Sequence, residues 1–320
     1  MTESTYSFWA KAGSTPNLVI YLQGGGACWS PESCVTDPTY YPDVTDADSP
    51  DFLHGIFAFG VEENPLKDWS FLYVPYCTGD LHWGSNDWVY KYAPGQSWTI
   101  HHRGLQNFLV ALKWAKENFP RPRKILITGS SAGGFGAIGV FPWVKRLYPA
   151  SRMYVLSDAG SGDTPREFDA LADLHWGIQL PWWVGGISKP IYLPEFWRKM
   201  AQRHPRVRFG EYVAAWDSTL TWYRNEILTY FQVATDESNV CEDFHTHLMN
   251  TIAFKQESPN YKSYVAQGQL HVILPRPQFY TEASAGISFL QWLSYMIYDS
   301  PAWDNVACSE DCGKPAGCPY

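Results

Sequence analysis

Short apolar runs alternate with helix-period segments along most of this chain. Apolar side chains recur at helical spacing from Arg103 to Asn118, and Pro120 ends the helix that this spacing predicts. A second helix is expected directly after the third strand, running to about Leu147. The runs rich in β-branched and aromatic residues predict strands at Leu18–Leu22, Phe71–Val74, Lys124–Thr128, Met153–Ser157, Val207–Ala214 and Tyr264–Gln267. This alternation is typical of an α/β fold with a mostly parallel sheet and helices on both faces.

The pattern breaks down between Gly160 and His204. This stretch contains Trp176, Trp182, Trp183 and Trp197 among prolines and glycines. A long irregular insertion is typical of a lid or cap, although an apolar cluster beneath a surface loop would hold the same tryptophans, and the two are compatible. Because no repeat, low-complexity tract or linker divides the chain, we expect one domain, 1–320, with a lid insertion at 160–204.

Composition and charge narrow the classes of function. The 320 residues include 24 Lys and Arg against 32 Asp and Glu, a formal net charge of −8 without any basic run. This balance argues against a nucleic-acid partner. The longest apolar runs are shorter than the roughly 20 residues that a membrane span needs. Aromatic residues make up 17% of the chain, with 16 Trp and 20 Tyr. They suit stacking on sugar rings, or simply fill the core.

Seven cysteines indicate disulfides. We expect a small loop closed by Cys28–Cys34 and a buried free thiol at Cys77. The other four cysteines allow three pairings and are Cys241, Cys308, Cys312 and Cys318. Three of them lie in the tail 305–320, which is rich in Gly and Pro and is expected to need a disulfide to stay ordered. Zinc held with His245 and His247 is the alternative, but the tail spacings are not those of a zinc ribbon or knuckle, so we expect no metal.

Disulfides imply an oxidising compartment. The N-terminus Met-Thr-Glu-Ser has neither the basic region nor the apolar region of an export signal. We therefore expect a secreted or periplasmic protein whose signal peptide lies outside this sequence.

The most informative segment is Gly129-Ser130-Ser131-Ala132-Gly133, which fits G-x-S-x-G between a strand and a helix. The flanking glycines permit a tight turn that lifts the Ser131 hydroxyl above the sheet edge. The N-terminal N–H groups of the next helix point toward the same place. The pattern predicts Ser131 as a nucleophile, although the same residue types also occur in ordinary strand-to-helix turns.

An activated serine needs a base and an acid that orients it, and this type of fold orders them serine, acid, histidine. His271 comes just after the last predicted strand, where the base belongs. Asp217 follows the preceding strand and is the predicted acid. Asp158 also ends a strand, but it comes early in this order, so it is the alternative acid and is expected to be a structural hydrogen-bonding residue.

Acyl transfer also requires donors for the oxyanion. One is the N–H of Ala132, which follows the nucleophile, and the second comes from an upstream glycine-rich loop. The loop Gln23–Trp29 follows a strand and fits that role. Read alone it could cradle a phosphate, but it lacks the Lys-Ser/Thr of a P-loop. A Cys28–Cys34 disulfide would pin this loop.

Taken together, the segments resemble the pectin acetylesterase/Notum family of α/β-hydrolases over nearly all of the chain. The segments that carry the resemblance are Tyr21–Trp29, Val74–Asp80, Gly129–Gly134, Leu156–Asp158 and Trp216-Asp217. The resemblance implies a Ser-His-Asp triad, which falls by motif match on Ser131, His271 and Asp217. It places Gly25, Gly26 and Ala132 at the oxyanion positions.

We therefore expect a serine carboxylesterase, working without a cofactor, that hydrolyses acyl and in particular acetyl esters of a polysaccharide such as pectin. The family includes carbohydrate deacetylases and a lipid deacylase, so the alternatives are a Notum-like lipid deacylase or a polyester hydrolase. A carbohydrate-binding relative without activity is a third, which the intact triad disfavours. Asp80, His82 and Trp83 lie on a loop expected at the same sheet edge, and we expect them to line the substrate site.

Overall fold

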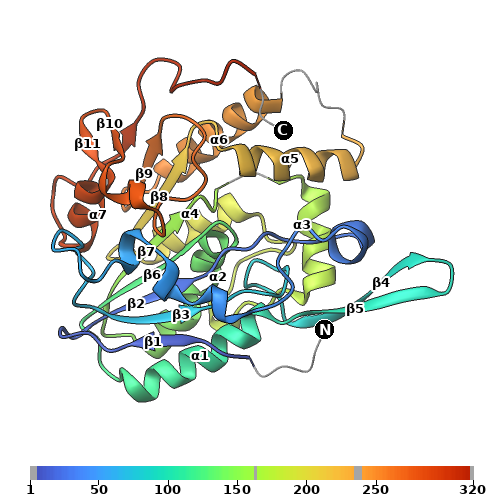
Figure 1. The fold of residues 1–320 in the computed structure, drawn as a ribbon, viewed down its shortest axis with the longest axis horizontal. Helices are drawn as coiled ribbons and strands as arrows, with labels where there is room; N and C mark the ends of the chain where they lie inside the picture. The colour runs from blue at the N-terminus through green and yellow to red at the C-terminus, as the bar shows by residue number, and fades with distance from the viewer. Residues whose placement is uncertain (1–5, 162–163, 234–239, 318–320) are drawn as a thin grey trace.

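The main sheet runs through the whole molecule (Figure 1). The computed structural model describes residues 6–161, 164–233 and 240–317. Eight strands lie in the order β1-β3-β2-β6-β7-β8-β9-β12, and only the β1–β3 pair is antiparallel. Their bounds are β1 Trp9–Lys11, β2 Asn17–Leu22, β3 Ser70–Val74, β6 Lys124–Ser130, β7 Arg152–Asp158, β8 Arg208–Ala214, β9 Tyr261–Ala266 and β12 Val306–Ala307. The predicted mostly parallel sheet is confirmed.

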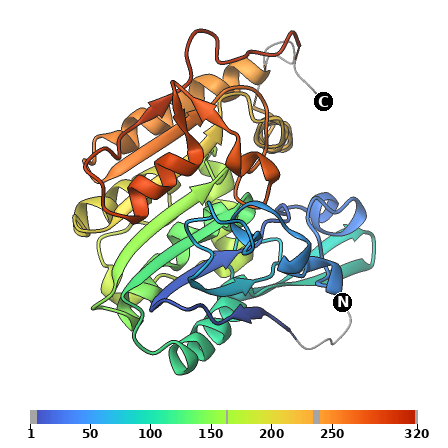
Figure 2. The same cartoon turned by 60° about the vertical axis from the view of Figure 1, so that its left-hand side comes forward.

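Helices cover both faces of this sheet. Their bounds are α1 Gly104–Asn118, α2 Ala132–Leu147, α3 Arg166–Ala172, α4 Leu193–Arg203, α5 Ser218–Tyr230, α6 Val240–Gln256 and α7 Phe289–Ile297. Alternate residues of β2 point to opposite faces of the sheet. Leu18, Ile20 and Leu22 pack in the apolar cluster that includes residues of α1, α2 and α4. Val19 and Tyr21 pack in the cluster that includes residues of α7. Figure 2 shows α7 on the near side of the sheet. The inner strands β2, β3, β6, β7, β8 and β9 are therefore buried on both faces, which explains their continuous apolar runs, whereas the edge strands β1 and β12 are partly exposed.

Shorter elements complete the described chain. The hairpin of β4 (Asn86–Ala93) and β5 (Gln96–His102) extends away from the body in Figure 1. A second, two-residue hairpin joins β10 (Ala283–Ser284) to β11 (Ile287–Ser288). Single turns of 3₁₀ or π helix lie at Glu32–Thr36, Asp46–Asp48, Pro50–Phe52, Gly55–Phe57, Asp173–Gly177, Trp182–Val184 and Pro277–Tyr280. None of the helices in the described ranges combines the length and apolarity that a bilayer crossing requires.

The segment 160–204 differs from the irregular insertion that its composition predicts. It contains the regular helices α3 and α4, and α4 packs on the sheet as part of the helical layer. Trp197 of α4 is almost completely buried and contacts Phe209 and Tyr261 edge-on. The prolines that suggested a loop lie at or before the helix starts, where proline is tolerated because its missing N–H has no helical partner. Trp176 is also buried, so this segment supplies core as well as surface.

The cysteines form the disulfides Cys28–Cys34 and Cys308–Cys312, and Cys241 is also disulfide-bonded. Cys318 lies outside the described residues. The Cys308–Cys312 bond uses two of the thiols that a zinc site in the tail would need. Cys77 is free, as expected, but it is half-buried rather than buried.

A buried ion pair fastens α6 to the sheet. The Lys255 ammonium of α6 donates to the Glu211 carboxylate of β8, and the Tyr261 hydroxyl donates to the same carboxylate. All three side chains are buried, and burial lowers the pKa of Lys255. Removing one partner of such a pair leaves an uncompensated charge in the interior.

We expect Lys255→Met to lower the free energy of unfolding by about 3–5 kcal/mol. The matched control is Lys262→Met, because Lys262 pairs with the exposed carboxylate of Asp304 and its loss should cost at most about 1 kcal/mol. Urea unfolding followed by circular dichroism measures both. Equal losses in the two variants would contradict the assigned role of the buried pair.

Candidate active site

Ser131 occupies a sharp turn between β6 and α2. Its backbone has φ +56° and ψ −122°, a conformation that residues other than glycine rarely adopt. A Cβ on Gly133 would lie 1.9 Å from the carbonyl oxygen of Leu22, at the end of β2. The glycine of the motif is therefore required by the close approach of β2 to the first turn of α2. This turn presents the half-exposed Ser131 at the carboxyl edge of the sheet.

Asp158 ties this turn to the loop that carries His271. Its carboxylate accepts from the Ser130 hydroxyl at 2.6 Å and from the N–H groups of Ile273 and Leu274, each at 2.9 Å to one of its oxygens. Its backbone carbonyl accepts from the Ser131 N–H at 2.8 Å. Burial raises the pKa of Asp158 to about 6. These bonds match the structural role expected for Asp158.

His271 is bonded to Asp217. Its Nδ1 lies 2.8 Å and 3.0 Å from the two carboxylate oxygens of Asp217, which is completely buried at the start of α5. Because an ionised carboxylate only accepts, Nδ1 carries the proton and Nε2 presents a lone pair. Nε2 is buried and has no hydrogen-bond partner in the described ranges. Ser131 and His271 line the same cleft, so the structure brings the three predicted residues to one edge of the sheet.

The glycine-rich loop after β2 offers free donors beside Ser131. Among the described residues, no acceptor is bonded to the N–H groups of Gly25, Gly26 or Ala132. Gly26 has φ +84°, and a Cβ there would lie 2.1 Å from the Thr39 carbonyl oxygen. The loop thus lines the cleft with backbone in a conformation and space that only glycine fits.

Gln23 fixes where this loop begins. Its side chain donates to Asp48 at 2.7 Å and accepts from the Tyr76 N–H at 3.0 Å. Its backbone carbonyl lies 2.9 Å from Nε2 of His82. Burial lowers the pKa of His82 to about 4, so at neutral pH the ring is uncharged and Nε2–H donates to that carbonyl.

Asp80 holds the loop that carries His82. Its carboxylate accepts from the Thr78 hydroxyl at 2.7 Å, from the His82 N–H at 3.1 Å and from the N–H of Gly104, at the start of α1, at 2.7 Å. Burial raises the pKa of Asp80 to about 6. Both Asp80 and His82 are fully buried behind the glycine-rich loop, so the structure does not place them where substrate would touch them.

Trp83 also lies away from the cleft. Its indole N–H donates to the Phe135 carbonyl at 3.0 Å, and its ring packs on Phe196 of α4. A Cβ on Gly139 of α2 would lie 2.4 Å from the indole. Asp80 and His82, which we expected to line the substrate site, are instead buried behind the glycine-rich loop. Trp83 lines a small cavity that shares Leu81, Phe135, Thr164 and Phe168 with the pocket beside Ser131, so its contact with substrate stays a prediction.

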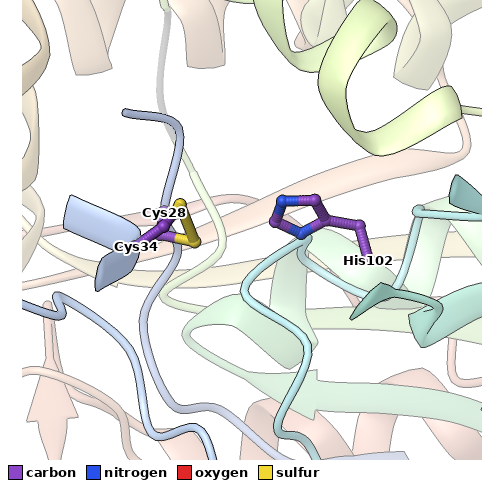
Figure 3. Close-up of side chains that lie close together, drawn as sticks. All are labelled: Cys28, Cys34 and His102. Carbon is purple, nitrogen blue, oxygen red and sulfur yellow. A yellow bond between two sulfur atoms is a disulfide. The ribbon is translucent and has the colours of Figure 1, made fainter. Parts of the chain in front are cut away.

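The Cys28–Cys34 disulfide braces the far end of the glycine-rich loop. The Cys28 N–H donates to the Gly79 carbonyl, and its own carbonyl accepts from the indole N–H of Trp176 at 2.9 Å. Figure 3 shows His102 beside the disulfide. The sulfurs are bonded to each other, and both nitrogens of His102 are used, by the Thr78 carbonyl and the Tyr90 hydroxyl. This cluster therefore offers no open set of metal ligands.

Ser131 lies where two cavities meet. We call the first cavity the open cleft, and His271 lines it together with Ser131. It has about 1650 Å³ of space including its opening to solvent, and its lining includes polar groups such as Arg276. Its walls are rich in aromatic residues, and Tyr41 and Phe52 are 72% and 70% exposed. Its aromatic residues are Tyr21, Tyr40, Tyr41, Phe52, Tyr73, Trp222 and Tyr223.

The second cavity, the apolar pocket, extends from Ser131 toward α3, α5 and α6. It has about 770 Å³ of space including its opening. Thr164, Pro165 and Phe168 from the segment 160–204 form part of its wall, so this part of the segment does reach the site. The apolar side chains around it include Trp29, Phe135, Phe168, Leu220, Ile227, Phe244 and Leu248.

Sequence reasoning missed the walls of both cavities. Phe52 lies in a 3₁₀ turn after β2, Arg276 follows β9, and Ile227 and Leu248 sit on different helices. No local pattern joins residues so far apart in the chain. The sequence does offer one signal for this wall. Phe52 and Tyr41 lie in polar, proline-rich segments, where aromatic residues of the core are unusual, and this position indicates that they are exposed.

Comparison with known proteins identifies relatives of this architecture. A family model described as Pectinacetylesterase matches residues 2–162, about half of the chain. A palmitoleoyl-protein carboxylesterase NOTUM from Schmidtea mediterranea is 25% identical over 132 residues, which is 40% of this chain and 24% of that protein. This match therefore spans about a quarter of the relative's length.

Solved structures support the fold. Two crystal forms of the Wnt deacylase Notum from Drosophila superpose with TM-scores of 0.69 and 0.68, covering 99% of this chain and 95% and 94% of those chains. Their sequence identity is 16% and 15%. At that identity the likeness shows a shared α/β-hydrolase-like fold.

We predict that His82 positions the glycine-rich loop. If the N–H groups of that loop bind an oxyanion, His82→Ala should lower kcat for p-nitrophenyl acetate by about tenfold or more and leave KM within about twofold, because misplaced donors weaken transition-state binding most. His82→Gln, which keeps a donor, should restore part of the loss. His101→Ala is the matched control, since His101 is exposed on β5 and bonded to Asp87. Steady-state kinetics measure all three, and a rise in KM with kcat unchanged would refute the positioning role.

Proposed function

The chain belongs to the pectinacetylesterase family, and from that premise we propose that it is a serine carboxylesterase acting on O-acylated polysaccharide, with acetyl esters as the first substrate class. The observation that carries the proposal is the arrangement at the sheet edge. The Ser131 turn and His271 line one cleft, and the buried Asp217 bonds His271 from behind. The glycine-rich wall of this cleft has N–H groups that bond to no acceptor among the described residues.

Hydrolysis proceeds in two steps. His271 Nε2 takes the proton of Ser131 as the hydroxyl oxygen attacks the ester carbonyl. Asp217 remains ionised and stabilises the imidazolium through Nδ1. The negative charge on the carbonyl oxygen is met by the N–H groups of Ala132 and of the loop residues Gly25 and Gly26. His271 then protonates the leaving alcohol, and water cleaves the acyl-enzyme by the same route.

The open cleft suits a carbohydrate on the alcohol side. It is wide, it opens to solvent, and it combines exposed aromatic faces with polar groups. Tyr41 and Phe52 are largely exposed at this cleft, where flat rings can stack on the apolar face of a sugar. Arg276, also exposed there, offers a cation to an acidic sugar. The excess of aromatic residues thus divides between core and cleft.

The apolar pocket favours a second candidate, an esterase for longer acyl chains. An acetyl group would fill only the part of this pocket next to Ser131, and the rest would stay empty beside apolar side chains. Each buried methylene of a longer chain would gain about 0.8 kcal/mol. The two candidates share the same triad and differ only in acyl chain length.

Ser131→Ala should abolish hydrolysis of p-nitrophenyl acetate and release of acetate from acetylated pectin, with a fall in kcat of at least about 10⁴-fold because the nucleophile is lost. Ser97→Ala, the same change at an exposed position on β5, is the control and should retain full activity. Retained turnover in Ser131→Ala would sink the assignment.

The length of the acyl chain can be tested at the pocket wall. Ile227→Trp should fill the apolar pocket and reduce kcat/KM for p-nitrophenyl octanoate by about tenfold or more, with kcat/KM for p-nitrophenyl acetate unchanged. Ile227→Leu is the matched control and should leave kcat/KM unchanged for both esters. Wild-type preference for acetate supports the polysaccharide deacetylase, and preference for octanoate supports the second candidate. An equal loss for both esters in Ile227→Trp would show that the pocket does not hold the acyl chain.

A further inference from the structure

A second large groove lies far from Ser131. It is formed by the last turns of α2 and α4 and the turn Trp182–Val184, and it has about 1070 Å³ of space including its opening. We call it the far groove. It shares no lining residue with the open cleft. Since α2 starts beside Ser131 and reaches this groove at Pro142, Lys145 and Arg146, the two sites are about 16–23 Å apart at 1.5 Å per residue.

Two neighbouring tryptophans mark this groove. Trp183 lines it and is 37% exposed, and Trp182 is 84% exposed, the highest value among the large apolar side chains described. The two indoles stand nearly perpendicular, with ring centroids 5.9 Å apart. Trp183 packs edge-on against Trp143, and the guanidinium of Arg146 lies over one face of its ring. An anchored indole at a groove and an exposed one next to it form a surface on which a flat, partly apolar ring can stack.

The same groove gathers positive charge without a counter-charge. Lys145, Arg146 and Arg203 line it together with His204. The Lys145 ammonium and the Arg203 guanidinium donate to backbone carbonyls, and in the described part of the chain no carboxylate lies within ion-pair distance of these three cations.

Neighbouring charges confirm this local excess. The pKa of His204 is lowered, first by burial and then by the adjacent charges of Lys145 and Arg203. The pKa of Lys145 is lowered by burial and by the charge of Arg206. The chain as a whole carries −8, so this is a cationic spot on an acidic protein. An anion placed here would relieve mutual repulsion of the cations and gain charge-assisted hydrogen bonds.

We infer that the far groove is a second, non-catalytic binding site for an anionic saccharide, a chain of uronate sugars. Sugar carboxylates would lie on Arg146, Lys145 and Arg203, and the ring faces would stack on Trp182 and Trp183. A neutral glycan would leave the cations unpaired. A nucleic acid is disfavoured because the groove has few cations and the net charge of the protein repels a dense polyanion.

The inference does not depend on the esterase chemistry, because the far groove and the open cleft have no residue in common. Its consequence is that a polymer bound at the far groove stays near the cleft, which raises the local concentration of its esters.

Titration of the full chain with unesterified oligogalacturonate, followed by calorimetry and tryptophan fluorescence, tests the site. Wild type should bind, binding should weaken as salt increases, and dextran should not bind. Trp182→Ala and Arg146→Glu should each raise Kd by about tenfold or more. The matched controls are Trp98→Ala and Lys91→Glu, both exposed on the β4–β5 hairpin, and should bind like wild type.

Four results would overturn the inference. The first two are that wild type does not bind oligogalacturonate, or that it binds dextran equally well. The third is that binding is lost in Phe52→Ala of the open cleft but kept in Trp182→Ala. The fourth is that duplex DNA binds equally tightly and that Trp182→Ala and Arg146→Glu abolish this binding. A concentration-dependent dimer that Trp182→Ala abolishes, without saccharide binding, would assign the groove to a second copy instead. Hydrolysis of p-nitrophenyl acetate should be unchanged in Trp182→Ala, so failure of the binding proposal is distinguishable from failure of the proposed esterase.

Discussion

The close contact between the end of β2 and the first turn of α2 is the constraint on which the site depends. Gly133 approaches the Leu22 carbonyl so closely that no side chain fits, and two residues earlier Ser131 has the positive φ that makes the turn sharp. The same contact sets the glycine-rich loop, which continues from Leu22, directly beside the serine. One packing contact in a buried parallel sheet thus positions both Ser131, the proposed nucleophile, and the glycine-rich loop, the proposed source of the oxyanion donors.

Two buried carboxylates then connect this centre to the surrounding loops. Asp158 bonds the serine turn to the segment after β9, which carries His271, and Asp80 orders the loop from which His82 holds Gln23. Burial raises the pKa of both carboxyl groups to about 6, although the hydrogen bonds that they accept act in the opposite direction. Neither needs to touch substrate for the geometry of the cleft to depend on it.

The cavities around Ser131 divide the proposed ester between two environments. In the proposed reaction the apolar pocket beneath α3, α5 and α6 would hold the acyl group, and the open cleft with its exposed rings would hold the alcohol. The far groove adds a third environment at the other end of α2, cationic and aromatic. A polymer long enough to span α2 could occupy the groove and the cleft at once, which neither a small ester nor a single sugar could do.

The amino-acid sequence by itself predicted the sheet, the helices α1 and α2, the serine turn and the residues His271 and Asp217, because strand and helix periods and the glycine spacing are local patterns. It could not place His82 behind the glycine-rich loop or show that Trp197 belongs to a regular helix in the core. It also could not tell which aromatics face a cavity. Those facts depend on residues more than fifty positions apart that the fold brings together, such as His82, which bonds Gln23, and Phe52 and His271, which line the same cleft. Only the packing of the folded chain decides them, since burial of a side chain is a property of its neighbours in space.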